Sequence, residues 1–174
     1  MVPAEPASAI VVRISVPRAL QRLRATWDRS ASVGVPAHVT ILFPFLPAER
    51  LLPEVHRELA AIAATQAPFE VRFERVGRFP DVVYLAPEPA APFVALTNAF
   101  VARYPELPPY GGAFDEVIPH LTVAESADAP LDEVAAAARR VLPFHHRVAS
   151  LEVLAEGGES RWRTHWRLPL GVRP

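Results

Sequence analysis

Apolar and polar residues alternate along several stretches of the chain. In residues 8–16 one face holds Ile10, Val12, Ile14 and Val16, and much of the other holds Arg13 and Ser15. A period of two is typical of a strand with one buried face. Residues 161–170 show the same period, which predicts one basic face. That face holds Arg161, Arg163, His165 and Arg167, opposite Trp162, Thr164, Trp166, Leu168 and Leu170. The predicted strands are residues 8–16, 36–43, 69–74, 82–85, 118–124, 147–154 and 161–170.

Between the predicted strands, apolar residues recur at helical spacing. Two segments repeat steps of three, four and three, which is the pattern of an amphipathic helix that packs on a sheet. The two predicted core stripes are Leu52, Val55, Leu59 and Ile62, and Leu131, Val134, Ala138 and Val141. The predicted helices are residues 18–28, 48–66, 91–104 and 131–142.

The order of predicted elements occurs twice. Residues 8–79 give strand, helix, strand, helix, strand, and the residues from 82 onward repeat this order. Interleaved elements with alternating strands favour antiparallel pairing covered by helices on one face. We therefore predict an α+β fold, with residues 1–174 as a single domain of two pseudo-twofold lobes, about 8–79 and 82–170. Antiparallel sheets should line a central cleft, with helices on the outer faces.

Each half contains one strand with a His-x-Thr sequence. Successive side chains of a strand point to opposite faces, so His38 and Thr40 share a face, as do His120 and Thr122. A pseudo-twofold axis between the halves would bring the two polar faces together. The residues predicted to hold the first strand in the core are Val39, Ile41 and Phe43.

Two facing imidazoles can divide the roles of acid and base, since an unperturbed pKa of about 6.5 allows one to be neutral and the other protonated. This pairing suits in-line displacement at phosphorus, with Thr40 and Thr122 donating hydrogen bonds to the phosphate oxygens. A metal site is the main chemical alternative. Neither strand supplies a further ligand, so we predict no metal and no cofactor.

In these motifs the sequence resembles the two-histidine phosphoesterases, which include 2′-5′ RNA ligase-like proteins and cyclic nucleotide phosphodiesterases. The resemblance rests on His38, Thr40, His120 and Thr122, and it implies a bilobal duplicated α+β fold. It also implies a phosphoric diester hydrolase acting without metal on 2′,3′-cyclic phosphates or 2′-5′ bonds of a small nucleotide or RNA end, with 2′-5′ RNA ligation as a further activity. Many ligase-like members carry a basic residue a few positions after the second threonine, where this chain has Glu125.

Five other residues are candidates for substrate binding, each with a structural alternative. Arg161 and Arg163 could bind phosphate or lie on a solvated face. Tyr84 and Phe45 could stack on a base or pack within the protein. Tyr110 precedes two glycines, in either a mobile loop over the site or a plain connector.

Composition narrows the range of partners. A net charge of −1 and a pI near 6.6 differ from the strongly basic balance of proteins that bind long duplexes. The sequence contains no cysteine, which excludes disulfides and thiolate nucleophiles. It shows neither a secretory signal nor a long apolar run, so we expect a cytoplasmic monomer outside the membrane. The alternative to an enzyme is a nucleotide- or RNA-binding module of the same fold without turnover.

Overall fold

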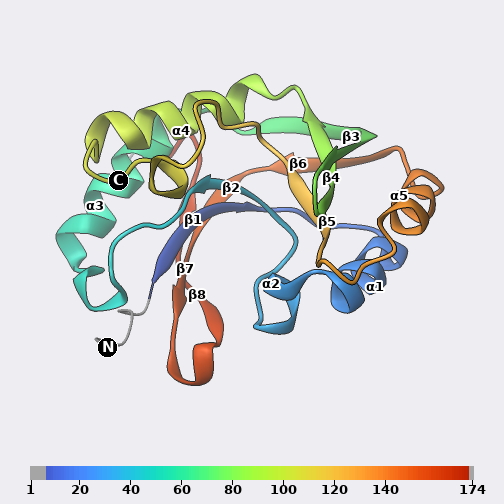
Figure 1. The fold of residues 1–174 in the computed structure, drawn as a ribbon. Coiled ribbons are helices and arrows are strands. Elements are labelled where there is room, and N and C mark those ends of the chain that lie inside the picture. The colour runs from blue at the N-terminus through green and yellow to red at the C-terminus, as the bar shows by residue number, and fades with distance from the viewer. Residues whose placement is uncertain (1–6, 173–174) are drawn as a thin grey trace.

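One antiparallel sheet of eight strands runs through residues 7–172, the part of the chain that the computed structural model describes. The strands lie in the order β6-β3-β4-β5-β2-β1-β7-β8, and the sheet curls into a half-barrel (Figure 1). The predicted α+β class is confirmed, although the antiparallel strands form one continuous sheet. The strands are β1 (Ser8–Arg13), β2 (His38–Leu42), β3 (Phe69–Phe79), β4 (Val82–Glu88), β5 (Leu121–Glu125), β6 (Phe144–Val148), β7 (Ser150–Glu156) and β8 (Trp162–Pro169).

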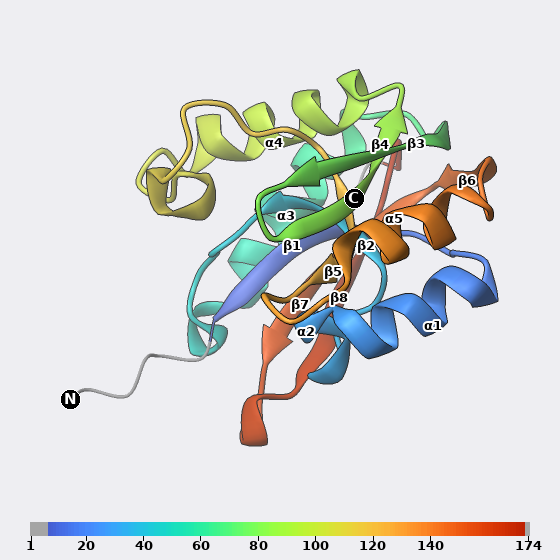
Figure 2. The same ribbon diagram turned by 45° about the vertical axis from the view of Figure 1, so that its right-hand side comes forward.

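Helices cover the sheet in two groups (Figures 1 and 2). Helix α1 packs on β5 and on α5, which also contacts β3 and β4, while α4 packs on β2 and α3 on β8. None of the helices in residues 7–172 is long and apolar enough to cross a membrane. The helices are α1 (Arg18–Trp27), α2 (Arg29–Ser32), α3 (Pro53–Ala64), α4 (Ala91–Arg103) and α5 (Leu131–Arg139), with 3₁₀ turns at Ala48–Arg50, Pro109–Gly112 and Gly158–Ser160.

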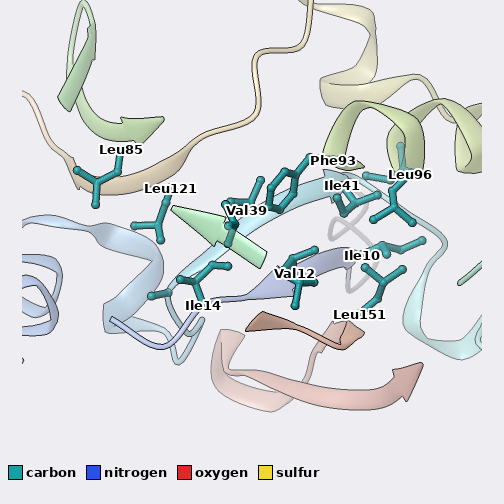
Figure 3. Close-up of a cluster of buried hydrophobic side chains, with 14 of the residues drawn as sticks. Ile10, Val12, Ile14, Val39, Ile41, Leu85, Phe93, Leu96, Leu121 and Leu151 are labelled. Carbon is teal, nitrogen blue, oxygen red and sulfur yellow. The ribbon is translucent and has the colours of Figure 1, made fainter. Parts of the chain in front are cut away.

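The main hydrophobic core lies between the sheet and these helices. Strand β1 buries every second residue in it, as the alternation of the sequence predicts, and β2 buries Val39, Ile41 and Leu42. Each fully buried aliphatic or aromatic side chain contributes about 1.5–3 kcal/mol of transfer free energy. Figure 3 shows part of this core, with Ile10, Val12, Ile14, Val39, Ile41, Leu85, Phe93, Leu96, Leu121 and Leu151.

Strands from the two halves of the sequence exchange places in the sheet. Strand β3, from the first half, lies between β6 and β4, and β7, from the second half, pairs with β1. The two His-x-Thr strands, β2 and β5, are neighbours at the centre. If the sheet consists of two pseudo-symmetric lobes, as we predict, each lobe therefore combines strands from both halves.

A β-bulge in β2 changes the face on which Phe43 lies. Ile10 pairs with Leu42 while Val11 pairs with Thr40, so Ile41 is an extra residue between the two pairs. Ile41 and Leu42 are both buried in the main core. Phe43 lies instead in a small apolar cluster with Val11 and Trp162, so the prediction that it packs in the main core is wrong.

A second bulge divides the basic face predicted for the last strand. Thr164 pairs with Leu154 and Trp166 with Val153, which makes His165 the extra residue. Alternation is shifted beyond this point, so Arg167 lies on the same face as Thr164, and Trp166 packs against the main core. The predicted grouping of Arg161, Arg163, His165 and Arg167 on one face is therefore wrong.

Two predicted elements are interrupted. The helix expected over residues 48–66 begins as a 3₁₀ turn and becomes α-helical only at Pro53. Leu52 precedes this helix and is 47% exposed, so its assignment to the core stripe is wrong. The strand expected over residues 147–154 is divided at Ala149 into the end of β6 and most of β7.

Candidate active site

The two His-x-Thr motifs lie side by side because β2 pairs with β5. Val39 pairs with Leu121, and both side chains are fully buried in the main core. Extending this antiparallel register by one residue in each direction sets His38 opposite Thr122, and Thr40 opposite His120. These four side chains therefore lie on the other face of the sheet, which we call the site face.

Both histidines make the same local hydrogen bond. His38 Nδ1 lies 2.8 Å from the carbonyl oxygen of Pro36, and His120 Nδ1 lies 2.7 Å from that of Ile118. A carbonyl oxygen only accepts, so Nδ1 must carry the proton and donate it. The Nε2 atom of each neutral ring is then unprotonated. This fixed tautomer leaves Nε2 as the atom available for proton transfer.

Burial controls the charge of His38. The side chain is partly exposed, but loss of hydration lowers its pKa to about 4, against the opposing effect of the Pro36 carbonyl. The positive charges of Arg24 and His120 lower it further, while Asp28 acts in the other direction. The imidazole is therefore neutral near pH 7 and has a free lone pair on Nε2.

A buried ion pair lies next to the motifs. Arg24 Nη2 bonds to Asp28 Oδ2 at 2.6 Å, and Arg24 Nε donates to the main-chain carbonyl of Thr122 at 3.1 Å. The backbone of Asp28 also forms an isolated parallel bridge with Glu125, beyond the point where β5 pairs with β2. The end of α1 thus supports β5 beside the motif. We did not predict this ion pair. The sequence does contain a signal for it, because Arg24 and Asp28 have opposite charges and lie four positions apart at the end of a predicted helix.

Aromatic rings border His120 on the β4 side. Tyr84 lies opposite both Thr122 and Gly77, which places it on the site face. Its ring stacks on Phe79 with centroids 4.4 Å apart. Both rings form edge-to-face contacts with His120, with centroid distances of 5.5 Å for Tyr84 and 5.2 Å for Phe79. Tyr84 is thus available to contact a ligand at the histidines. Phe79 was missed because it ends a strand with an ambiguous pattern.

Tyr110 reaches the site from the long connection between α4 and β5. Its main-chain nitrogen donates to the Phe43 carbonyl at 2.6 Å, and its ring packs against Phe114. Burial raises the pKa of the Tyr110 phenol, while the nearby hydroxyl of Thr40 lowers it. Tyr110 also adopts a left-handed backbone with φ 53°, which is uncommon for a residue other than glycine. The interaction with the Thr40 hydroxyl shows that the Tyr110 side chain lies beside Thr40.

Three further candidates are not brought to the motifs. Phe45 is 4% exposed and packs against Tyr104 in the main core. Arg163 follows Trp162 by one residue and so projects from the opposite face of β8. Arg161 donates to the carbonyl of Ser32, the last residue of α2.

The described residues offer no set of metal ligands, because no three histidine or carboxylate side chains gather within residues 7–172. Glu125 is exposed at the end of β5. The site as it stands combines two imidazoles, two hydroxyls and an aromatic border.

An antiparallel half-barrel with a His-x-Thr sequence on each of its two central strands defines a protein of the two-histidine phosphoesterase class. The family model described as the 2′-5′ RNA ligase superfamily matches residues 12–159. The chain therefore belongs to this superfamily, and the predicted resemblance is confirmed. No curated protein sequence matches the chain.

Solved structures with the same fold include LigT of E. coli and TT0787 of Thermus thermophilus. Apo LigT is 18% identical, with a TM-score of 0.58, and TT0787 is 19% identical, with a TM-score of 0.61. In both comparisons 97% of this chain and 100% of the other are covered. LigT has also been solved in complex with 3′-AMP, NADP⁺ and ATP. At these identities the likeness concerns the fold.

Proposed function

We propose that this protein is a metal-independent phosphodiesterase that cleaves 2′,3′-cyclic phosphate or 2′-5′ phosphodiester bonds in a small nucleotide or RNA end. The observation that carries the proposal is the pairing of Val39 with Leu121, since it sets the two His-x-Thr motifs against each other. Membership in a phosphoesterase superfamily supports an enzyme of this type. The nucleotide complexes of LigT support a small nucleotide as the ligand. A cytoplasmic location and a monomeric state stay predictions.

In the proposed reaction His38 is the base and His120 the acid. Neutral His38 accepts a proton at Nε2 from water as the water oxygen attacks phosphorus. The bond from phosphorus to the leaving sugar oxygen breaks, and His120, which enters the reaction as the imidazolium, donates the proton on its Nε2 to that oxygen. A phosphomonoester and a free hydroxyl result, and the proton gained by His38 and lost by His120 is exchanged with solvent. Each of these roles is typically worth about 10²–10⁴ in rate.

Thr40 and Thr122 would hold the reacting phosphate. Each hydroxyl lies across the strand pair from the histidine of the other motif, so both can donate to non-bridging phosphate oxygens while the histidines act in line. The bound anion also raises the pKa of His38 above its ligand-free value of about 4, because opposite charge favours the protonated ring. His38 is thus a stronger base in the complex than in the free protein.

The test is turnover of nucleoside 2′,3′-cyclic phosphates in excess EDTA, with product analysis. We expect hydrolysis by the wild type and a loss of at least about 10²-fold in kcat/KM for His38→Ala and for His120→Ala. His145→Ala, on the exposed face of β6, is the matched control and should keep full activity. Activity that requires added Zn²⁺ or Mn²⁺ would contradict the mechanism, and activity that survives both alanine substitutions would contradict the site.

The same screen separates the enzyme from a binding module. Substrates should include 2′-5′ linked dinucleotides as well as cyclic phosphates, since the leaving oxygen differs between them. Binding of these compounds without any product would favour the module. A free hydroxyl and a phosphomonoester in equal amounts are the expected products of the enzyme.

A further inference from the structure

A buried carboxylate on the site face holds two arginines. Glu152 of β7 is 2% exposed, and its Oε1 accepts a hydrogen bond from Arg167 Nη2 at 2.9 Å. Its Oε2 accepts from the Thr164 hydroxyl at 2.8 Å, and Arg13 Nη1 lies 3.8 Å from Oε1. We call Arg13, Glu152, Thr164 and Arg167 the arginine cluster.

The arginine cluster begins one strand away from His38. Arg13 pairs directly with His38 across β1 and β2, and Glu152 pairs with both Val11 and Arg167. Paired residues share a face, so the whole cluster lies on the site face, on the side of His38 away from His120. Neighbouring strands are about 4.8 Å apart, a step that the atoms of one nucleotide easily span.

The cluster carries more positive charge than its structure requires. One arginine is enough to neutralise Glu152, and Arg167 with Thr164 already occupies both carboxylate oxygens. Arg13 adds a second cation at a longer distance. Glu152 is the one acidic partner of either arginine within residues 7–172. The Arg13 and Arg167 side chains are 54% and 64% exposed, so their remaining N–H groups face solvent above a buried carboxylate.

We propose that the arginine cluster binds a second phosphate group of the substrate, beside the phosphate that lies between the histidines. Guanidinium groups present paired N–H donors that match the oxygens of a phosphate, and Glu152 holds them in place before binding. The second phosphate is an internucleotide phosphodiester or a terminal 5′-phosphate. The inference rests on the proposed function, which places the first phosphate.

The test measures binding rather than turnover. Isothermal titration compares a nucleoside 3′-monophosphate with the 3′,5′-bisphosphate and with a dinucleotide that has a 3′-phosphate and a free 5′-hydroxyl. For the wild type we expect the ligands with two phosphates to bind roughly tenfold more tightly than the monophosphate. Arg13→Gln and Arg167→Gln should each remove most of this advantage, so that the variant binds ligands with one and two phosphates with similar affinity.

Arg147→Gln is the matched control. Arg147 is 65% exposed on edge strand β6 and pairs with Glu70 at 3.1 Å, so the substitution removes a comparable strand arginine outside the cluster. Arg147→Gln should keep the full difference in affinity between ligands with two phosphates and the monophosphate.

An equal affinity for one and two phosphates in the wild type, or an unchanged ratio of these affinities in both cluster variants, would overturn the inference. If only the 3′,5′-bisphosphate binds more tightly than the monophosphate, the cluster binds a terminal phosphate. If the dinucleotide also binds more tightly, the cluster accepts a terminal phosphate or an internucleotide phosphodiester. If turnover fails while the ratio behaves as expected, the proposed catalysis is wrong and the phosphate site stands.

Discussion

The ring of Tyr84 lies directly over the backbone of Gly77. A Cβ atom added to Gly77 would come within 2.2 Å of Tyr84 Cζ, which is closer than any real contact of this kind. Glycine in the interior of a strand often marks such an approach. The missing side chain on β3 therefore allows Tyr84 to lie flat on Phe79, beside His120.

We predict that Gly77→Ala impairs the site. The methyl group must displace the Tyr84 ring, which costs about 1–3 kcal/mol of overpacking and moves the aromatic border of His120. KM for a cyclic nucleotide should rise several-fold, and the near-UV circular dichroism of the tyrosine should change. Gly158→Ala is the control, because no atom lies within 4 Å of its added Cβ. Equal kinetics for the two variants would contradict this role of Gly77.

The hydrogen bonds at Nδ1 predict the tautomers of both motif histidines. With Nδ1 of His38 and His120 donating to the Pro36 and Ile118 carbonyls, Nε2 should be unprotonated in the neutral rings. Long-range ¹H–¹⁵N correlation spectra of the histidine rings distinguish the two tautomers. The variants His38→Asn and His120→Asn assign the signals. A neutral ring with its proton on Nε2 would contradict the assignment for that histidine.

Removal of one member of the buried ion pair should be costly. Asp28→Ala leaves the Arg24 guanidinium, whose side chain is 5% exposed, without its counter-ion, and it also removes the cap of α2. We expect a loss of about 3–5 kcal/mol in the free energy of unfolding, measured with urea. Asp132→Ala breaks an ion pair of similar length with Arg78 on the surface, and it should change stability little. A similarly small effect of Asp28→Ala would contradict the importance of the buried pair.

Local periodicity was enough to predict most elements, and the repeated order of elements led to the prediction that the two motifs lie near each other. Periodicity failed where a single extra residue shifts a strand. The sequence near Ile41 and His165 does not indicate a bulge, because a bulge depends on the register between neighbouring strands. The consequence at each place is a change of face, for Phe43 in one strand and Arg167 in the other.

Contacts between residues far apart in the chain could not be predicted from the sequence either. Arg24 follows Leu20 by four positions and shares its buried face, but the carbonyl of Thr122 that it binds belongs to the other half of the chain. The same holds for Glu152, which is a charged residue within the strand predicted over residues 147–154. Its burial depends on Arg13 and Arg167 from two other strands. The two His-x-Thr motifs could therefore be identified from the sequence, whereas the charged residues around them could be identified only from the fold.

The lowered pKa of His38 predicts a specific dependence of stability on pH. In the unfolded chain His38 takes up a proton below about its ordinary value of 6.5, whereas in the folded protein it does so only below about 4. Between these values the unfolded state binds more protons, so the free energy of unfolding falls as the pH falls from 6.5 towards 4. Above 6.5 the ring is neutral in both states and contributes no such dependence.

The variant His38→Asn should lose this part of the pH dependence. Urea unfolding of wild type and variant at several pH values between 4 and 7 measures the difference, and an NMR titration of the ring gives the pKa itself. Burial also lowers the pKa of His146, so the variant will keep some dependence of its own. His145→Asn, exposed on the same strand as His146, is the control and should follow the wild type. A His38 ring that titrates near 6.5 in the ligand-free protein would contradict both the prediction and the assignment of His38 as the neutral base.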